Sequence, residues 1–486
     1  MLEDIIKERQ KKLELFHSAN VDVYPACVKR TITAAAAITD FNKLLKFKKK
    51  VFLVGRIMGL RDQGNLIFTD ITDASGKIQS IFKKDALKNY TVLKKGLDIG
   101  DFVEVGGVAF LTKKGEKSIE AREVRIISKS VLPLPSEWYG VKDVETRLRK
   151  RYLDILLNNE AKGIFIKKAK FWNTFRSNLN EAGFLEVETP VLESIPGGAE
   201  AEPFKTHHNA LNEDYYLRIS LELPLKKLLV AGYEKVFEIG RIFRNEGIDK
   251  EHLQDYTQLE FYSAYEDYND LMKFVEKLYK DVIKSVCGKL KIKHEGVLIN
   301  WGSKWPKVYY CTEFKKVNKI DPSNTTREEL INRANELKID FDKHIGIGRL
   351  IDLIFKKTVR PKLIQPCFLI DPPVEIEPLA KRSALNPKVV ERMQVIACGT
   401  ELGKGFSELN NPEDQRKRFE DQMKLREGGD KEAQRLDEEY LEAMEYGMPP
   451  ASGFGVSERL FAVIMDISVR EAVIFPLMRA KNDSVE

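Results

Sequence analysis

Residues 236–246 read VFEIGRIFRNE and, after a polar stretch, residues 256–262 read YTQLEFY. Together they predict a β-strand, a charged loop and a returning strand. Alternation with a period of two would put the side chains of Arg244 and Glu246 on one face of the first strand. A guanidinium beside a carboxylate can hold a phosphate oxygen and an adenine amino group. An isolated pair of this kind is by default a surface ion pair, so it does not identify a site alone.

Two other segments flank this one in the chain. Residues 183–192, GFLEVETPVL, indicate a helix that ends near Gly183 and a strand that runs into Pro190. Residues 447–460, GMPPASGFGVSERL, indicate a glycine-rich turn that lets a ligand approach the backbone closely, followed by an apolar helix over residues 460–467. Taken alone, the first is an ordinary helix–strand junction, and Arg459 in the second is equally an ion pair at a helix start.

Composition limits the class of protein. Of 486 residues, 43% are hydrophobic and 32% charged, as in an ordinary soluble protein, and the length predicts at least two domains. No apolar run is long enough for a membrane helix, and the acidic amphipathic start lacks a signal-peptide core, so secretion is not expected. Five cysteines without a CxxC pair and six scattered histidines predict neither a disulfide framework nor a zinc site, which fits a reducing cytoplasm.

The N-terminal part differs from the rest in charge and in pattern. Residues 1–150 carry 29 basic against 19 acidic side chains, and the remainder carries 51 against 55. This indicates either that the first part meets a polyanion or that it has a solvated lysine-rich surface. Five short β-like runs and a helical stretch over residues 84–95 predict a five-stranded barrel of the OB type. The runs are residues 51–57, 66–70, 77–82, 101–105 and 118–121.

These patterns predict the domain organisation. A helical extension would cover residues 1–50, with an amphipathic helix over 3–17, and the OB barrel would cover 51–130. A proline-containing linker would cover 131–146. From residue 147 to 486 helices and strands mix without a βαβ rhythm, which favours a large α+β domain in which helices flank an antiparallel sheet, with an insertion at about 285–335.

In their order along the chain, the three segments resemble motifs one, two and three of class II aminoacyl-tRNA synthetases, and class I signatures are absent. The chain resembles lysine–tRNA ligases in particular at residues 195–199, 203–211, 216–219, 362–366, 377–381 and 405–410. The resemblance runs from Val51 to Arg479. It implies an enzyme that activates L-lysine with ATP and transfers it to the 3′-terminal adenosine of tRNA. It also implies a cytoplasmic homodimer with no membrane partner, because motif one builds the dimer interface in this class.

The resemblance implies roles for residues that bind ATP. Arg244 would bind the α-phosphate, Glu246 the adenine amino group, and His252 would lie along the phosphates. Tyr256, where many relatives have Phe, would stack on one face of the adenine. Arg459 would cover the other face and reach the γ-phosphate, so Arg244, Glu246 and Arg459 would be the catalytic residues.

The resemblance also implies a metal site, a lysine pocket and an anticodon site. Glu401 would bind Mg²⁺. The lysine pocket would be acidic, because buried carboxylates need a partner that a substrate ammonium supplies. Its residues would be Gly198, Glu222, Glu260, Tyr262, Lys404, Phe406 and Glu408. In the barrel, Phe68 would stack on an anticodon base, with Arg61 and Gln79 bonding to base or backbone. A place in the barrel core is an equal alternative for Phe68.

Three positions depart from the family pattern. Gln394 stands where relatives have a second metal-binding Glu, and a neutral amide is a poorer Mg²⁺ ligand, so the number of ions is open. Lys404 stands where relatives have Asn; its ammonium either pairs with the substrate carboxylate, which we favour, or enters the acidic pocket and competes with lysine. The run from Gly453 to Arg459 is one residue shorter than usual, which predicts a locally rebuilt backbone.

Three rival functions are consistent with parts of this pattern. An aspartate- or asparagine-type ligase belongs to the same class but would not need so many acids in its pocket. A paralogue that transfers lysine to a protein usually lacks the barrel. A catalytically inactive tRNA-binding protein would tolerate the departures at Gln394 and Lys404.

Overall fold

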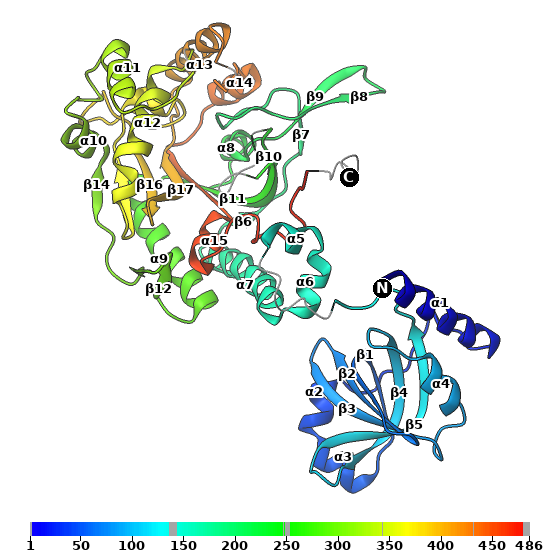
Figure 1. The fold of residues 1–486 in the computed structure, drawn as a ribbon. Helices are drawn as coiled ribbons and strands as arrows, with labels where there is room; N and C mark the ends of the chain where they lie inside the picture. Colours follow the sequence, from blue (N-terminus) through cyan, green and yellow to red (C-terminus); the bar gives the residue numbers. More distant parts are fainter. Residues whose placement is uncertain are drawn as a thin grey trace. The chain divides into compact units, whose positions relative to one another are not determined.

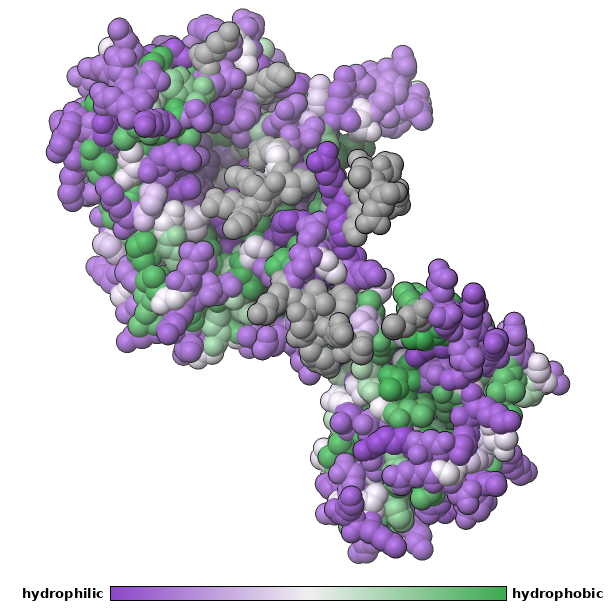
Figure 2. All heavy atoms as spheres, viewed as in Figure 1, coloured by the Kyte–Doolittle hydropathy of each residue, from purple (hydrophilic) through white to green (hydrophobic). Residues whose placement is uncertain are grey.

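The computed structural model describes residues 2–135, 143–245, 247, 253–342, 344–430 and 432–479. It divides into two compact units, Met1–Gly140 and Val141–Glu486 (Figure 1). On the face drawn in Figure 2, hydrophilic residues cover most of the surface of each unit. Within the described ranges, no helix combines the length and the apolar character needed to span a membrane.

The first unit contains a closed five-stranded barrel with the order β1-β2-β3-β5-β4, which confirms the predicted OB type. Neighbouring strands are antiparallel except β3 and β5, which are parallel. The strands are β1 (Val51–Asp62), β2 (Leu66–Asp73), β3 (Gly76–Lys83), β4 (Phe102–Leu111) and β5 (Lys117–Ser128). Alternate apolar residues such as Leu53, Ile71 and Ile126 fill the interior, because successive side chains of a strand point to opposite faces.

Four helices pack with this barrel: α1 (Leu2–Ser18), α2 (Ala34–Thr39), α3 (Phe41–Phe47) and α4 (Tyr90–Gly96). The predicted N-terminal helix is α1, whereas the predicted helix at 84–95 begins only at Tyr90. The ring of Phe16 is fully buried against Gly96, where a Cβ atom would overlap it. The Arg9 guanidinium donates to the carbonyl oxygens of Ser130 at 2.8 Å and Ile99 at 3.0 Å. Helix α1 is therefore built into the first unit.

The second unit is organised around an eight-stranded sheet with the order β14-β15-β16-β17-β18-β11-β10-β6. The predicted antiparallel sheet is confirmed for the six central strands, and the edge strands β14 and β6 run parallel to their neighbours. The strands are β6 (Leu185–Glu186), β10 (Lys235–Phe243), β11 (Asp255–Ala264), β14 (Lys307–Tyr309), β15 (Cys367–Ile370), β16 (Arg392–Ala397), β17 (Thr400–Ser407) and β18 (Ala451–Ser457). Strand β14 lies within residues 285–335, so part of that stretch extends the sheet.

One face of this sheet packs against α7 (Asn159–Glu181), α9 (Tyr268–Cys287) and α15 (Arg459–Met465). Phe261 and Phe454 from the strands meet Phe171, Tyr279 and Phe461 from these helices in a fully buried aromatic cluster. Such a cluster stabilises the unit through the area it removes from water and through edge-to-face ring contacts. The opposite face carries polar side chains and also apolar ones such as Ile242 and Phe406, which belong to a second buried cluster.

The remaining elements pack around both faces of the sheet or on the helices that cover it. The helices are α5 (Val144–Arg149), α6 (Arg151–Leu157), α8 (Glu222–Val230), α10 (Tyr310–Asn318), α11 (Arg327–Glu336), α12 (Ile347–Thr358), α13 (Pro412–Glu427) and α14 (Glu438–Glu445), with short 3₁₀ turns η2 (Arg360–Lys362) and η3 (Val374–Ile376). The small sheets pair β7 (Leu192–Glu193), β9 (Glu213–Leu217) and β8 (Lys205–His208), and β12 (Lys291–His294) with β13 (Val297–Asn300).

One local prediction was wrong, and another is not tested. The glycine-rich segment is not a turn, because residues 451–457 form β18, which pairs with β11 on one side and β17 on the other in an unbroken register. Strand β10 ends at Phe243, so Arg244 lies one residue beyond it, although its backbone N–H still donates to the Gln254 carbonyl oxygen at 2.8 Å. Glu246 and His252 lie outside the described residues, so the shared face of Arg244 and Glu246 stays a prediction.

We expect Gly348→Ala to lower the free energy of unfolding by about 1–3 kcal/mol, as at other overpacked positions. Gly348 lies in α12 against η3, and a Cβ atom there would overlap the carbonyl oxygen of Glu375. Denaturant-induced unfolding measures the change. Gly163→Ala in α7 is the matched control: nothing lies within 4 Å of its Cβ position, so it should raise stability by about 0.5–1 kcal/mol. Equal effects of the two substitutions would contradict this packing.

Candidate active site

A cavity of about 270 Å³ lies on the polar face of the central sheet. Alternate residues of β11, from Tyr256 to Tyr262, line it, while Leu259 and Phe261 between them enter the aromatic core. Helix α8 contributes Glu222 to its wall. Because side chains of a strand alternate between its two faces, β11 has one hydrophobic face and one face whose side chains line the cavity.

Two rows of paired residues cross four strands and form the floor of the cavity. The first row is Gln394–Lys404–Gly455–Glu260, and the second is Arg392–Phe406–Gly453–Tyr262. In each row the residue from β18 is a glycine, so the middle of the floor carries no side chain. A Cβ atom at Gly453 would overlap the Tyr262 ring and the Glu408 carboxylate, whereas a Cβ at Gly455 would meet nothing closer than 3.5 Å.

Three carboxylates gather at one end of this floor. Glu222, Glu260 and Glu408 are 6%, 3% and 1% exposed. Glu260 is held by neutral donors: the Ser220 hydroxyl at 2.9 Å, the Gln258 amide at 2.6 Å and the Tyr262 hydroxyl at 2.9 Å. Such a group of acids is suited to bind a cation, because buried carboxylates without a positive partner are costly.

A lysine that sequence reasoning missed lies behind these acids. Lys226 is fully buried, its Nζ is 2.5 Å from a Glu222 oxygen, and it forms a second ion pair with Glu408. The ammonium also lies 5.2 Å from the centre of the Phe406 ring. The available signal was the spacing of four between Glu222 and Lys226, which places them on one face of a helix.

Burial dominates the ionisation of these groups. It raises the pKa of Glu222 to about 7, although the Lys226 ammonium opposes the rise. Burial likewise raises the pKa of Glu408 well above its ordinary value. Burial disfavours the charge of Lys226, but the two carboxylates outweigh it and the pKa of Lys226 is raised.

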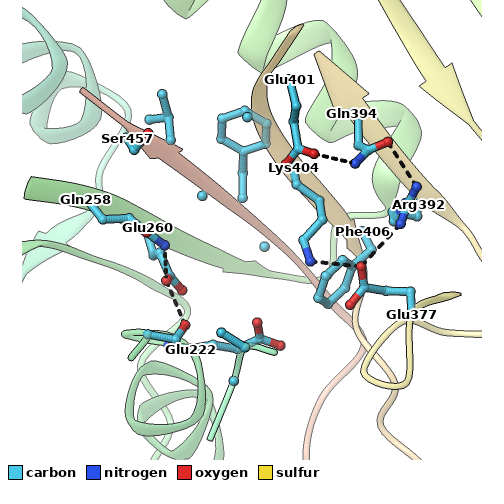
Figure 3. A pocket seen from close by; sticks show the side chains of 18 of the residues that line it. Glu222, Gln258, Glu260, Glu377, Arg392, Gln394, Glu401, Lys404, Phe406 and Ser457 are labelled. Atoms are coloured by element: carbon cyan, nitrogen blue, oxygen red, sulfur yellow. Dashed lines mark hydrogen bonds and ion pairs between the residues drawn. The ribbon is translucent and has the colours of Figure 1, made fainter. Parts of the chain in front are cut away.

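Lys404 does not enter the acidic group. Its Nζ donates to Glu377 at 2.9 Å, and Glu377 is also 3.5 Å from Arg392 (Figure 3). Burial disfavours its charge, but Glu377 and Glu401 raise the pKa of Lys404, so it carries a full charge. The alternative in which Lys404 pairs with the acids of the lysine pocket is therefore not what the structure shows. A bond to a substrate carboxylate stays a prediction.

Glu401 is the carboxylate that the sequence assigns to Mg²⁺. One of its oxygens accepts a hydrogen bond from the Gln394 amide at 2.8 Å, and Gln394 in turn accepts one from Arg392 at 2.9 Å (Figure 3). Within the described part of the chain, no three acidic, histidine or cysteine side chains form a group that would hold a metal by themselves. Magnesium is commonly bound by one or two carboxylates together with substrate phosphates, so Glu401 fits an ion that arrives with a nucleotide.

The residues assigned to ATP lie at the same cavity. Arg244, Tyr256, Glu401 and Arg459 all line it. The Arg244 guanidinium lies 5.8 Å from the centre of the Tyr256 ring, and Arg459 begins α15, where its backbone N–H donates to the Ser457 hydroxyl at 3.3 Å. The structure thus brings together these four residues and all seven assigned to lysine.

In the first unit, Arg61, Phe68 and Gln79 line an open hollow of about 1060 Å³ on the barrel. Arg61 and Phe68 are direct partners across β1 and β2, and the Gln79 side chain accepts a hydrogen bond from Ser118 at 2.9 Å. Phe68 is only half-buried and lies outside the barrel core. The hollow is also bordered by Lys77, Lys83, Lys113, Lys114 and Lys117. An aromatic ring among basic side chains is suited to a nucleic acid.

Comparisons with known proteins agree with both units. A family model described as tRNA synthetases class II (D, K and N) matches residues 143–479, and one described as an OB-fold nucleic acid binding domain matches residues 51–127. The chain is 42% identical to a lysine–tRNA ligase of Moorella thermoacetica over 99% of both chains. It is 41% identical to lysine–tRNA ligases of Carboxydothermus hydrogenoformans, over 99% of both chains, and of a Roseiflexus species, over 99% of this chain and 100% of that one.

We expect the two floor glycines to respond differently to substitution. Gly453→Ala should displace Tyr262 and Glu408, and so lower thermal stability together with ligand affinity. Gly455→Ala should leave the melting temperature within about 2 °C of the wild type, because its Cβ would make only ordinary van der Waals contacts, but should weaken a ligand that fills the floor. Calorimetric melting and ligand titration measure the two effects. A loss of stability in Gly455→Ala would contradict the description of the floor.

Proposed function

The chain belongs to the class II lysine–tRNA ligases, enzymes that activate lysine with ATP and esterify it to tRNA, and we propose that its cavity binds ATP and lysine side by side for both steps. One observation carries the proposal: the described residues assigned to ATP and those assigned to lysine line the same 270 Å³ cavity. The acids of the α8 end would receive the lysine ammonium, and the arginines would receive the phosphates.

In the first step the lysine carboxylate attacks the α-phosphorus of ATP, lysyl-adenylate forms and pyrophosphate leaves. Attack needs no general base, because the carboxylate is already ionised. Arg244 would neutralise the α-phosphate, Arg459 the γ-phosphate, and the half-buried Lys404 ammonium would hold the carboxylate in position. In the second step the 3′-terminal hydroxyl of tRNA attacks the carbonyl carbon and AMP leaves.

Glu401 would hold a Mg²⁺ ion that comes with the ATP phosphates, and Glu246 and His252 would contribute to nucleotide binding as the family resemblance implies. When bound, the ion supplies positive charge to the leaving pyrophosphate. Gln394 supplies a neutral amide beside Glu401. Lys404, which is paired with Gln394 across β16 and β17, supplies a fixed positive charge. These two residues favour fewer tightly held ions than two carboxylates would bind.

The other functions considered from the sequence are not favoured. Full-length similarity to lysine–tRNA ligases argues against an aspartate- or asparagine-type ligase and against an inactive tRNA-binding protein. The closed barrel with its basic hollow argues against a paralogue that modifies proteins, because such paralogues usually lack the barrel.

We further propose a cytoplasmic homodimer in which residues 1–50 extend the anticodon domain of residues 51–130, and a linker of 131–146 joins it to a catalytic domain of 147–486. Large apolar side chains are exposed in the motif-one segment, at Leu185, Val191 and Leu192, and in the preceding helices α6 and α7, at Tyr152 and Ile166; they are 39–65% exposed. Exposed apolar groups of this kind support a subunit interface there.

The test of the activity is isotope exchange between pyrophosphate and ATP, with each of the twenty amino acids in turn. Exchange with lysine alone, and only with Mg²⁺ present, is expected. Glu408→Gln should raise the KM for lysine by about tenfold or more, because it removes a buried charge from the pocket. Exchange with another amino acid would show that Lys404 alters the specificity, and exchange with none would leave only tRNA binding.

The same assay should show a pH dependence that originates in Glu222. Because the pKa of Glu222 is about 7, this carboxylate gains a proton as the pH falls below 7 and loses its attraction for an ammonium. The KM for lysine should therefore be about tenfold higher at pH 6 than at pH 8, with the KM for ATP unchanged. Glu222→Gln should have a high KM that depends less on pH over this range than the KM of the wild type. A flat profile in the wild type would contradict the assignment.

The barrel residues should affect tRNA charging alone. Phe68→Ala should raise the KM for tRNA about 10- to 100-fold, as expected for the loss of one base stack. Pyrophosphate exchange does not involve the barrel and should be unchanged. Phe47→Ala removes a more exposed ring of the same unit that does not line the hollow, and serves as the control. Equal effects of the two variants on charging would argue against Phe68 as an anticodon contact.

A further inference from the structure

Lys226 is a buried ammonium that has no role in either step of the reaction described above. It lies one turn after Glu222 on α8, and its side chain is fully buried. It contacts Glu222 and Glu408 but does not line the cavity, whereas both carboxylates do. Each carboxylate thus lies between a protein ammonium on one side and the cavity on the other.

The three pocket acids are compensated in different ways. Glu260 is surrounded by hydroxyl and amide donors. Glu408 makes an ion pair with Lys226, and its carboxylate oxygens have no other recorded donor among the described residues. Glu222 lies against Lys226 as well. The charge of two of the three acids is therefore tied to one ammonium.

The other groups around this pair are mostly acidic or neutral. Glu260 and Tyr262 face it from β11, and Tyr440 faces it from α14. From β17, the Phe406 ring lies near Lys226, and the Lys404 ammonium acts on Glu222 from further away while it is paired with Glu377. Lys226 is thus the cation in direct contact with the pocket acids among the residues described.

We propose that Lys226 is a positioning residue that favours the ionised forms of Glu222 and Glu408 and holds the two carboxylates apart, so that the pocket selects a side chain bearing one additional ammonium. The inference rests on the proposed lysine subsite. With Lys226 in place, one protein ammonium lies beside the three acids, and the substrate ammonium would add a second positive charge. Without it, burial would favour protonation of the two acids, and a neutral side chain would then fit as well as a charged one.

The test compares Lys226→Met with Lys227→Met, which removes the adjacent lysine that is paired with Glu439 near the surface. Lysine-dependent pyrophosphate exchange is measured between pH 6.5 and 9, with norleucine as the uncharged competitor. Lys226→Met should raise the KM for lysine about 10- to 100-fold at pH 7, corresponding to one or two units of pKa. It should lower the preference for lysine over norleucine by a similar factor. Lys227→Met should match the wild type.

The pH profile separates a charge effect from a packing effect. In Lys226→Met the KM for lysine should recover as the pH approaches 9, because the two acids then ionise without the ammonium. A rise in KM that is equal at every pH would mean that Lys226 only fills space, and would overturn the proposal. An unchanged KM or an unchanged preference over norleucine would overturn it as well.

A second variant covers the case in which Lys226→Met does not fold. Lys226→Met combined with Glu408→Gln removes one charge of each sign and leaves less unpaired charge in the core. Its KM for lysine should exceed that of Glu408→Gln alone, because Glu222 also loses its partner. An equal KM would overturn the proposal.

If Glu222→Gln and Glu408→Gln both bind lysine like the wild type, the lysine subsite is wrong and the inference fails with it. If they weaken lysine but Lys226→Met does not, only the inference fails.

Discussion

Three buried carboxylates lie against the polar face of the central sheet, and their mutual repulsion is the constraint that the site has to meet. Burying one ionised carboxylate without a partner is costly, and burying three together is more so. The second unit meets this with hydroxyl and amide donors around Glu260 and with the Lys226 ammonium against Glu222 and Glu408. The negative charge that remains uncompensated faces the cavity, and the cavity is therefore suited to bind a cation.

The strand β18 lets the charged groups surround an open space. Gly453 and Gly455 occupy the polar face of the strand, while Phe454 and Val456, which alternate with them, belong to the aromatic core. A strand normally carries side chains on both faces, so the glycines give up packing on one face to leave room for a ligand. Pairing on both sides keeps this thin part of the sheet rigid.

Much of the fold was predictable because local pattern and tertiary structure agree. Each of the five β-like runs falls on a different barrel strand, since period-two alternation over short segments reports a sheet with one buried face. The glycine-rich segment was misread as a turn because glycine is common in turns, and only its two neighbouring strands reveal it as β18. Lys226 was missed because a lysine on a short helix is usually a surface residue; its burial depends on Glu408, which is far away in the sequence. The position of the Lys404 ammonium likewise depends on its ion pair with Glu377, and no local sequence pattern connects these two residues.

The Phe406 ring has an ammonium near it in two places, with Lys226 at 5.2 Å and Lys404 at 5.9 Å from its centre. Lys226 belongs to the acids of the α8 end, and Lys404 to the chain of Glu377, Arg392, Gln394 and Glu401. The Phe406 ring therefore lies where the part of the cavity that would recognise a side chain meets the part that would handle phosphate. An arrangement of this kind makes the two halves separable for protein engineering. Pocket acids can be exchanged to admit unnatural amino acids, while the charge network that would serve adenylation remains as it is.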